Sequence, residues 1–238
     1  ALPPRGHALW LCVGEPQAVP AAPMWRSLPV APAGISADHP NLLVLDHAEL
    51  VLDGQPALAE AIPRLDSLLW YHLGQPTSPW DRSIQFRRTV IDRDLSHLPG
   101  FTLSYHAEVL AGAQLSDVRL AVERPGLWRV AVNGHAVDDW RPWFDMDMAA
   151  AAVGRWLRVG RNTITLRADR PHPLHEIAPA YLQGDFALHA QPHGFALGPA
   201  RPLALGWWRE LGRPLACGRM AYAWELHLAE PVVRLRVR

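Results

Sequence analysis

Two tryptophans and three aspartates are concentrated in one short stretch of the chain. They are Trp140 and Trp143, with Asp138, Asp139 and Asp145 beside them. An exposed indole ring can stack on the apolar face of a sugar ring, and carboxylates accept hydrogen bonds from sugar hydroxyl groups. The stretch is therefore a candidate carbohydrate-binding site. In the alternative interpretation, one tryptophan fills the end of a β-sandwich and the aspartates lie in turns or cap a helix.

Glu176 and Asp185 form a second candidate pair of carboxylates. Glycoside hydrolysis commonly uses two carboxyl groups on opposite sides of the bond that is cleaved. Because spacing along a sequence does not give a separation in space, we prefer a structural interpretation, with one acid in a loop and the other in a turn. Glu176 could also form a buried ion pair with an arginine. We expect no catalytic residue and keep Glu176 as a candidate carbohydrate-binding residue.

Metal binding is the third chemistry to consider. Asp145 and Asp147 stand at the start of a predicted helical turn over residues 146–153, where carboxylates complement the positive end of a helix. Their spacing, together with loop carbonyl oxygens, would also suit calcium. We expect capping, no metal site and no cofactor, with a structural calcium ion as the alternative.

Two pairs of histidines have the spacing that zinc-binding helices use. They are His172 with His175, and His189 with His193. Prolines beside both pairs argue against helices, and no further set of ligands accompanies them. We therefore interpret these histidines as surface or sheet residues. The sequence also contains no phosphate-binding glycine motif and no hydrolase nucleophile motif.

The composition fits a globular protein and narrows its partners. The 238 residues are 49% hydrophobic, and 23 basic residues, all of them arginine, balance 23 acidic ones, so the formal net charge is zero. This balance argues against a nucleic-acid-binding surface. No apolar run approaches the roughly 18 residues that span a bilayer. We therefore expect neither a nucleic-acid nor a membrane partner.

The cysteines and the chain ends say little about location. Cys12 and Cys217 belong to no metal-type spacing, and we expect free thiols. This leaves the cytoplasm and an exported location both open. The chain does not begin with methionine, shows no signal-peptide pattern and stops within an alternating strand, so we expect a fragment of a longer chain.

Strands must position the candidate residues. Residues 118–122 and 128–132 alternate between apolar and polar or small side chains. Such alternation is typical of a strand with one buried face. Asn133-Gly134 then predicts a type I′ hairpin turn, because both residues tolerate positive φ. A second corner at 160–162 precedes a β-branched strand over residues 163–166.

Other segments complete the predicted elements. A stripe of leucine and isoleucine over residues 58–73 has helical spacing, and Pro63 inside it predicts one or two short helices instead of one long helix. The segment at 74–80 is rich in proline and reads as a linker. Further strands are expected at 8–13, 24–30, 41–46, 48–52, 83–90, 101–109, 187–188, 195–197 and 222–228.

The order of the motifs resembles a known family. A Val-Asn-Gly turn at 132–134 is followed by a W-x-x-W-x-D motif at 140–145 and a Gly-x-Asn-Thr-Ile corner at 160–164. This order resembles the galactose-binding-like jelly-roll domains, the sugar-binding sandwiches of large glycoside hydrolases such as the family 2 β-glycosidases. Residues 174–186 are similar to a segment of the rhamnosidase-like hydrolases. Residues 208–222 look like the W-x-x-x-G-x-P-x-x-x-G-x-x-x-Y opening of another such sandwich.

The resemblance implies an all-β fold, a galactose-binding-like β-sandwich with a short helical connector and partial flanking β segments. The implied division of the chain is closing strands of a preceding β domain at 1–54, a helical connector and linker at 55–80, the sandwich at 81–204, and the truncated start of a second sandwich at 205–238. In that opening segment, Leu215 and its neighbours stand where the family usually carries aromatic residues.

The resemblance also implies a function. The catalytic barrel of such enzymes, with its two carboxylates, has no counterpart in this sequence. The implied role is a non-catalytic accessory region of a multidomain bacterial glycoside hydrolase, with carbohydrate or the catalytic domain of its own parent chain as partner. The alternatives are a free-standing carbohydrate-binding module and a purely structural sandwich spacer.

Overall fold

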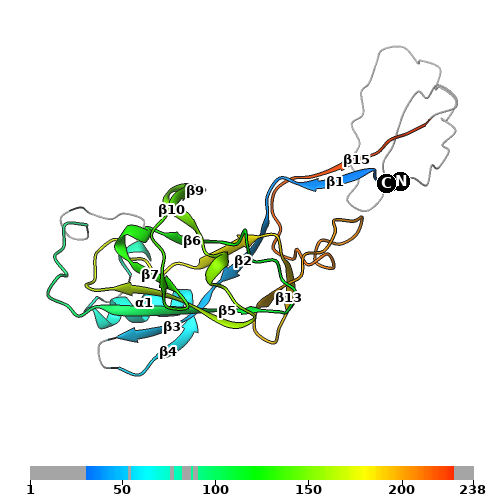
Figure 1. The fold of residues 1–238 in the computed structure, drawn as a ribbon. Coiled ribbons are helices and arrows are strands. Elements are labelled where there is room, and N and C mark those ends of the chain that lie inside the picture. The colour runs from blue at the N-terminus through cyan, green and yellow to red at the C-terminus, as the bar shows by residue number, and fades with distance from the viewer. Residues whose placement is uncertain (1–30, 53–54, 76–77, 82–86, 88–90, 228–238) are drawn as a thin grey trace, which may run out of the picture. The chain divides into compact units, whose positions relative to one another are not determined.

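The computed structural model describes residues 31–52, 55–75, 78–81, 87 and 91–227. Residues 32–225 form one compact unit (Figure 1). The second unit, 1–31 with 226–238, is described only at Ala31, Leu226 and His227. The strands expected at 8–13 and 24–30, most of the strand expected at 83–90, and Cys12 therefore lie outside the described residues.

The described chain is an all-β sandwich with one α-helix, as the sequence predicts. One sheet has the strand order β2 (Asn41–Leu45), β12 (Ala180–Gly184), β6 (Arg119–Glu123), β10 (Asp145–Ala152) and β9 (Arg141–Trp143). The other runs β13 (Ala187–Ala190), β14 (Phe195–Gly198), β5 (Phe101–Val109), β11 (Gly160–Ala168), β7 (Arg129–Val132) and β8 (His135–Ala136). Off this path, β3 (His47–Leu52) pairs with both β5 and β4 (Leu58–Ala61).

Alternating side chains fill the space between the two sheets. Every second residue of β5, from Phe101 to Val109, is buried, and β11 buries Asn162, Ile164, Leu166 and Ala168. From the facing sheet, Leu120 and Leu182 are also fully buried. Because neighbouring residues of a strand point to opposite faces, this pattern fixes the register of each strand. The predicted strands at 101–109 and 118–122 are thereby confirmed.

The predicted hairpin turn at Asn133-Gly134 is confirmed, and it is tied to the second corner. Asn133 and Gly134 have φ values of 49° and 85° and connect β7 to β8. The Asn133 Nδ2 donates to Oδ1 of Asn162, at 2.8 Å, and Oδ1 of Asn133 accepts the N–H of Thr163. Asn162 is fully buried and its Nδ2 donates to the Arg158 and Gly160 carbonyls. We call this pair of side chains the asparagine clasp.

The predicted helical turn at 146–153 is wrong. Residues 145–152 form strand β10, which pairs with β6 on one side and with β9 on the other. The alanine run suggests a helix by propensity, but here the small side chains fit between two neighbouring strands; Ala150 lies opposite Ala121 and is fully buried. Tertiary pairing therefore overrides local propensity. The helical turn lies later, in the short 3₁₀ helix η4 (Gly154–Trp156).

The predicted short helix is confirmed as α1 (Ile62–His72). Pro63 occupies its first turn instead of interrupting it, which suits proline because its missing N–H is not needed there. Leu58 belongs to β4, while Leu65 and Leu69 are fully buried. Asp66 joins the helix to the sandwich, because its Oδ1 accepts the N–H of Ile177 at 3.0 Å.

The boundary expected at 55–80 does not separate two domains. Strand β2 pairs with β12, and Leu50 of β3 lies opposite Leu103 of β5. The described part of 1–54 that forms these strands is thus integral to the sandwich. The sequence did not reveal this because both partners lie far along the chain, and short-range patterns carry no information about such pairings.

The segment that resembles the opening of another sandwich packs on this one. The carbonyl of Gly212 accepts the N–H of Leu188 and the Nδ2 of the buried Asn41. A Cβ on Gly212 would lie 2.5 Å from that of Ala187, so a side chain has no room here. Leu215 packs against the core. A second sandwich stays a prediction, since most of its strands would lie outside the described residues.

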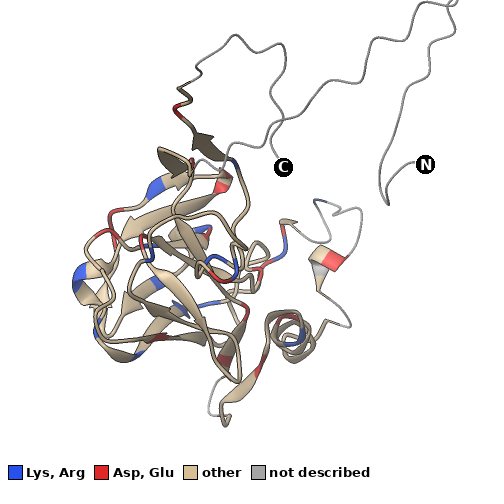
Figure 2. Ribbon diagram, turned by 90° about the vertical axis from the view of Figure 1, so that its right-hand side faces the viewer, with Lys and Arg blue, Asp and Glu red and all other residues tan. Residues whose placement is uncertain are grey.

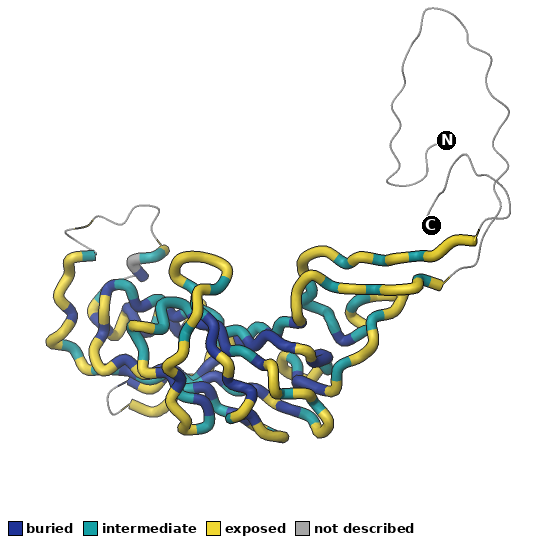
Figure 3. The backbone as a smooth tube through the Cα atoms, turned by 45° about the horizontal axis from the view of Figure 1, so that its top comes forward, coloured by how far each residue is buried: buried dark blue, intermediate teal, exposed yellow. Residues whose placement is uncertain are grey.

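The compact unit begins and ends in one two-stranded ribbon. Strand β1 (Gly34–Ala37) pairs antiparallel with β15 (Met220–Ala223). No residue of either strand is buried, as Figure 3 shows. Where the ribbon meets the sandwich, the Asp38 carboxylate accepts the N–H of Arg219 at 2.9 Å.

Two further observations concern the distribution of charge and the hydropathy of the helices. Arginines and acidic residues are interspersed along the described chain (Figure 2). Among the helices of the described part, none is long and apolar enough to cross a membrane.

The asparagine clasp yields a prediction about stability. Replacing Asn162 by alanine removes the partners of the Asn133 amide, the Arg158 N–H and two carbonyls in a buried setting. We expect Asn162→Ala to lower the free energy of unfolding by about 2–4 kcal/mol, measured by urea denaturation. The matched control is Arg161→Ala, an exposed neighbour in β11, which should change it by less than about 0.5 kcal/mol. Equal effects of the two substitutions would contradict a stabilising role for the clasp.

Candidate functional site

A cleft of about 300 Å³ lies where the β8 hairpin meets the end of β10 and η4. This volume is at the lower end of the range found for small-molecule sites. It combines two carboxylates, a guanidinium, a hydroxyl and an indole with small apolar side chains. The lining residues are Ser116, Ala136, Val137, Asp138, Asp139, Ala151, Ala152, Gly154, Arg155 and Trp156.

Two backbone anchors hold the walls of the cleft. On one wall, the N–H of the buried Val137 donates to the Val130 carbonyl at 2.9 Å, which places the exposed Asp138 and Asp139 at the mouth. On the other wall, Gly154 packs so closely on the chain that a Cβ would lie 1.7 Å from the Leu115 carbonyl oxygen. Only glycine fits there, and the turn of η4 that follows carries the remaining side chains.

Trp156 and Arg155 were missed in the sequence. The Arg155 guanidinium lies 4.3 Å from the centre of the Trp156 ring, and the His135 ring is parallel to that indole at 6.0 Å. The Trp156 carbonyl accepts Nδ2 of Asn133, so the asparagine clasp also holds this corner of the cleft. The Gly-Arg-Trp triplet at 154–156, just before the predicted corner at 160–162, is the signal in the sequence that indicates these two residues.

The two tryptophans singled out by spacing do not line this cleft. Trp140 packs against the core, and its Nε1 donates to the Val137 carbonyl at 3.0 Å. Trp143 stands on β9 with its ring 5.8 Å from that of Tyr181. Of the predicted carbohydrate-binding residues, the cleft therefore brings together Asp138 and Asp139.

Asp145 and Asp147 hold the backbone of β10. The Asp145 Oδ1 accepts the N–H groups of Asp147 and Met148, at 2.9 and 2.8 Å. The Asp147 carboxylate pairs with Arg124 at 2.8 Å. Asp145 therefore caps a turn within a strand and Asp147 forms an ion pair, since residues 145–152 form a strand and not the expected helix. Among the described residues, no group of three or more histidine, cysteine or acidic side chains is arranged to hold a metal ion.

The histidine pair at 172 and 175 organises a loop. Nδ1 of His175 accepts the N–H of His172, and its Nε2 faces the Leu127 carbonyl at 3.0 Å, so the neutral ring with a proton on Nε2 satisfies both contacts. Burial lowers the pKa of His175 to about 4, which favours this neutral form.

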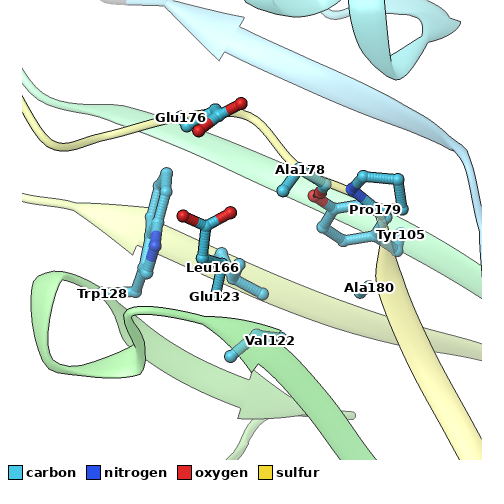
Figure 4. A pocket seen from close by; sticks show the side chains of 9 residues that line it. All are labelled: Tyr105, Val122, Glu123, Trp128, Leu166, Glu176, Ala178, Pro179 and Ala180. Carbon is cyan, nitrogen blue, oxygen red and sulfur yellow. The ribbon is translucent and has the colours of Figure 1, made fainter. Parts of the chain in front are cut away.

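Glu176 lines a second, much smaller pocket, opposite Glu123 and beside Trp128 (Figure 4). Its volume of about 10 Å³ leaves room for one water molecule at most, so no sugar fits. Burial raises the pKa of Glu176, and the nearby Asp66 raises it further. Burial also raises the pKa of Glu123, and Glu176 adds to this effect. Glu123 was not recognised as a site residue in the sequence, because it directly follows the predicted strand at 118–122 and no nearby motif points to it.

Arg124 balances part of this acidic region. Its guanidinium pairs with Glu123 at 3.0 Å and with Asp147 at 2.8 Å, and it lies 5.4 Å from the centre of the Trp80 ring. Its backbone is left-handed, with φ of 43°. The sequence suggested a buried ion pair between Glu176 and an arginine; instead, Arg124 pairs with two other carboxylates, and neither of these ion pairs is buried.

The pairing of Glu176 with Asp185 is excluded by the fold. Asp185 is exposed and follows the end of β12, whereas Glu176 precedes the start of that strand. A strand of this length spans roughly 16 Å, which is too far for two carboxyl groups to act on one glycosidic bond.

Comparison with known proteins gives one likeness. No protein-family model and no curated protein matches the chain. Among solved structures, the chain is similar to the β-D-glucuronidase of Dictyoglomus thermophilum, with 12% identity and a TM-score of 0.37. The match takes in 66% of this chain and 31% of that enzyme's chain. A likeness of this size does not establish a family or an activity, so the fold class rests on the sheets themselves.

The raised pKa of Glu176 gives a prediction about pH. A carboxyl group whose pKa is higher in the folded state stabilises the fold while it is protonated, and this stabilisation is lost as the pH rises through the raised pKa. Glu176→Gln, which mimics the protonated form, should therefore increase the free energy of unfolding at pH 7, on the order of 0.5 kcal/mol because the group is partly screened by solvent. The gain should vanish below about pH 4, where the carboxyl group of Glu176 is protonated in both the folded and the unfolded state.

The measurement is urea denaturation of both proteins across that pH range. Taking the difference between variant and parent removes the opposite pH dependence of His175, which both share. Glu108→Gln, at an exposed position of β5, is the matched control and should show no such difference. A loss of stability at pH 7 in Glu176→Gln would contradict the prediction.

Proposed function

We propose that this region is a non-catalytic accessory β-sandwich of a multidomain bacterial glycoside hydrolase and that it contacts carbohydrate at the cleft between Asp138 and Trp156. The observation that carries the proposal is the lining of this cleft. Two carboxylates and a guanidinium can share hydrogen bonds with sugar hydroxyl groups, and an indole offers an apolar wall. The order of motifs along the chain, which resembles the galactose-binding-like domains, supports the same role.

The geometry of the candidate carboxylates supports a binding role over hydrolysis. The carboxylate pair that faces across a pocket, Glu123 and Glu176, encloses too little space for a glycosidic bond. Asp138 and Asp139 are adjacent in the chain and both exposed, so they do not flank a bond from two sides as the carboxyl pair of a glycoside hydrolase does. A free-standing carbohydrate-binding module would use the same cleft, and a structural spacer would leave it without a ligand.

Titration calorimetry with galactose, rhamnose, glucose, xylose and their short oligomers tests the proposal. We expect at least one sugar to bind with a Kd of about 1 mM, equivalent to about 4 kcal/mol. Asp138→Asn and Asp139→Asn should weaken that binding about tenfold without changing stability, because both side chains are exposed. Asp46→Asn, at an exposed position between β2 and β3, is the control and should bind as the parent does.

Two results would contradict the proposal. If none of these sugars binds at concentrations of tens of millimolar, the region does not bind carbohydrate and the structural spacer is the remaining interpretation. Release of nitrophenol from an aryl glycoside by this chain, lost in Glu123→Gln or Glu176→Gln, would show that the region is catalytic.

A further inference from the structure

The tip of the β9–β10 hairpin exposes two large apolar side chains. Phe144 is 90% exposed and Met146 is 100% exposed. We call these two residues the apolar tip. Strand β9 is the edge of its sheet, so the tip stands where another molecule can reach it (Figure 1). Burying either side chain in a contact would be favourable, and nothing within the described chain does so.

The backbone of the tip is held in an unfavourable conformation. Phe144 has a φ of 64°, a left-handed value that is rare for a bulky residue. Beyond it, the register between the two strands shifts between Asp145 and Ala149, which forms a β-bulge. Strain and bulges of this kind cluster where a side chain must be presented to a ligand or a partner.

Hydrogen bonds fix this conformation from below. The Asp145 carboxylate accepts two backbone N–H groups of the bulge, and the Asp147 carbonyl accepts the N–H of Arg124 at 2.7 Å. The Trp143 ring lies 6.0 Å from that of Phe144 and supports it from the side. Phe144 and Met146 are therefore held outward before any partner arrives, which lowers the entropy cost of binding.

We propose that the apolar tip docks into an apolar pocket of a partner protein, and that the rim of this pocket is basic. The charge at the base of the tip selects the partner. One guanidinium, that of Arg124, stands against the three carboxyl groups of Glu123, Asp145 and Asp147, and the first and last of these pair with it. The remaining negative charge complements arginine or lysine side chains and disfavours an anionic lipid surface.

This surface is separate from the carbohydrate cleft. The cleft is lined from the far end of β10, at Ala151 and Ala152, whereas the tip precedes the residues of that strand that pair with β6, which begin at Met148. If an accessory domain braces the catalytic domain, the apolar tip is the surface through which the two would make contact. It does not depend on sugar binding, so each proposal can fail alone.

Photo-crosslinking in the complete natural protein tests the inference. Benzoylphenylalanine is placed at position 146, and at the exposed Val159 as the control, and crosslinked peptides are mapped by mass spectrometry. We expect the position-146 adducts to be at least tenfold more abundant than the control adducts and to map to apolar residues flanked by arginine or lysine. Adducts to lipid, to a second copy of the tip, to an acidic surface, or at the control level would overturn the proposal.

A second variant separates docking from folding. Phe144→Gly removes both the apolar ring and the unfavourable φ, so it should leave the urea midpoint of the region unchanged or higher. In the same variant, crosslinking from position 146 should fall at least tenfold. A lowered midpoint would show that Phe144 serves the fold of the domain itself and would overturn the inference. Carbohydrate binding measured on the same variant should be unchanged, which keeps the two proposals distinguishable.

Discussion

The structure depends on the hydrogen bonds between the side chains of Asn133 and Asn162. A tight turn and a strand start, distant in sequence, meet through two amides that bond each other and five nearby backbone groups. A buried amide is costly unless its donors and acceptors are satisfied, so the clasp forms in full only when β7 and β11 are in register. It therefore selects one pairing of these strands and also positions η4, which carries one wall of the cleft.

The elements that could be predicted from the sequence are those that local chemistry determines. Alternation identified β5, β6 and β7, and Asn133-Gly134 identified its turn, since both signals lie within a few residues. The strands β10 and β12 were not recognised: the alanine run of the former has helical propensity, and the latter is covered on both sides by neighbouring strands and shows no clear alternation. Membership of β2 and β3 in the sandwich depends on long-range pairing, which no local pattern expresses.

The candidate site likewise contains some residues that local sequence could indicate and others that depend on long-range packing. Asp138 and Asp139 could be named because they stand beside Trp140 and Trp143 in the sequence, a local pattern of residue types that requires no knowledge of the fold. Trp156 and Arg155 could not, because their position depends on Gly154 meeting the Leu115 carbonyl, a contact between segments far apart in sequence. Trp140 was prominent in the sequence because of its type, yet its ring completes the core. Residue types in the sequence therefore indicate which side chains could bind a sugar, but long-range packing decides where each side chain lies. Packing places Trp140 against the core and Trp156 in the cleft.

The ribbon of β1 and β15 has a mechanical consequence. The two strands are antiparallel, and Gly34 and Ala223 lie opposite each other at the end away from the sandwich. Tension applied between these two residues loads the ribbon hydrogen bonds one after another, as in a zipper, and not all at once in shear. The ribbon would therefore open at low force, and the Asp38–Arg219 contact at its base would be the next to bear load. The sheets beyond it, with their clasp, would remain folded while the ribbon opened.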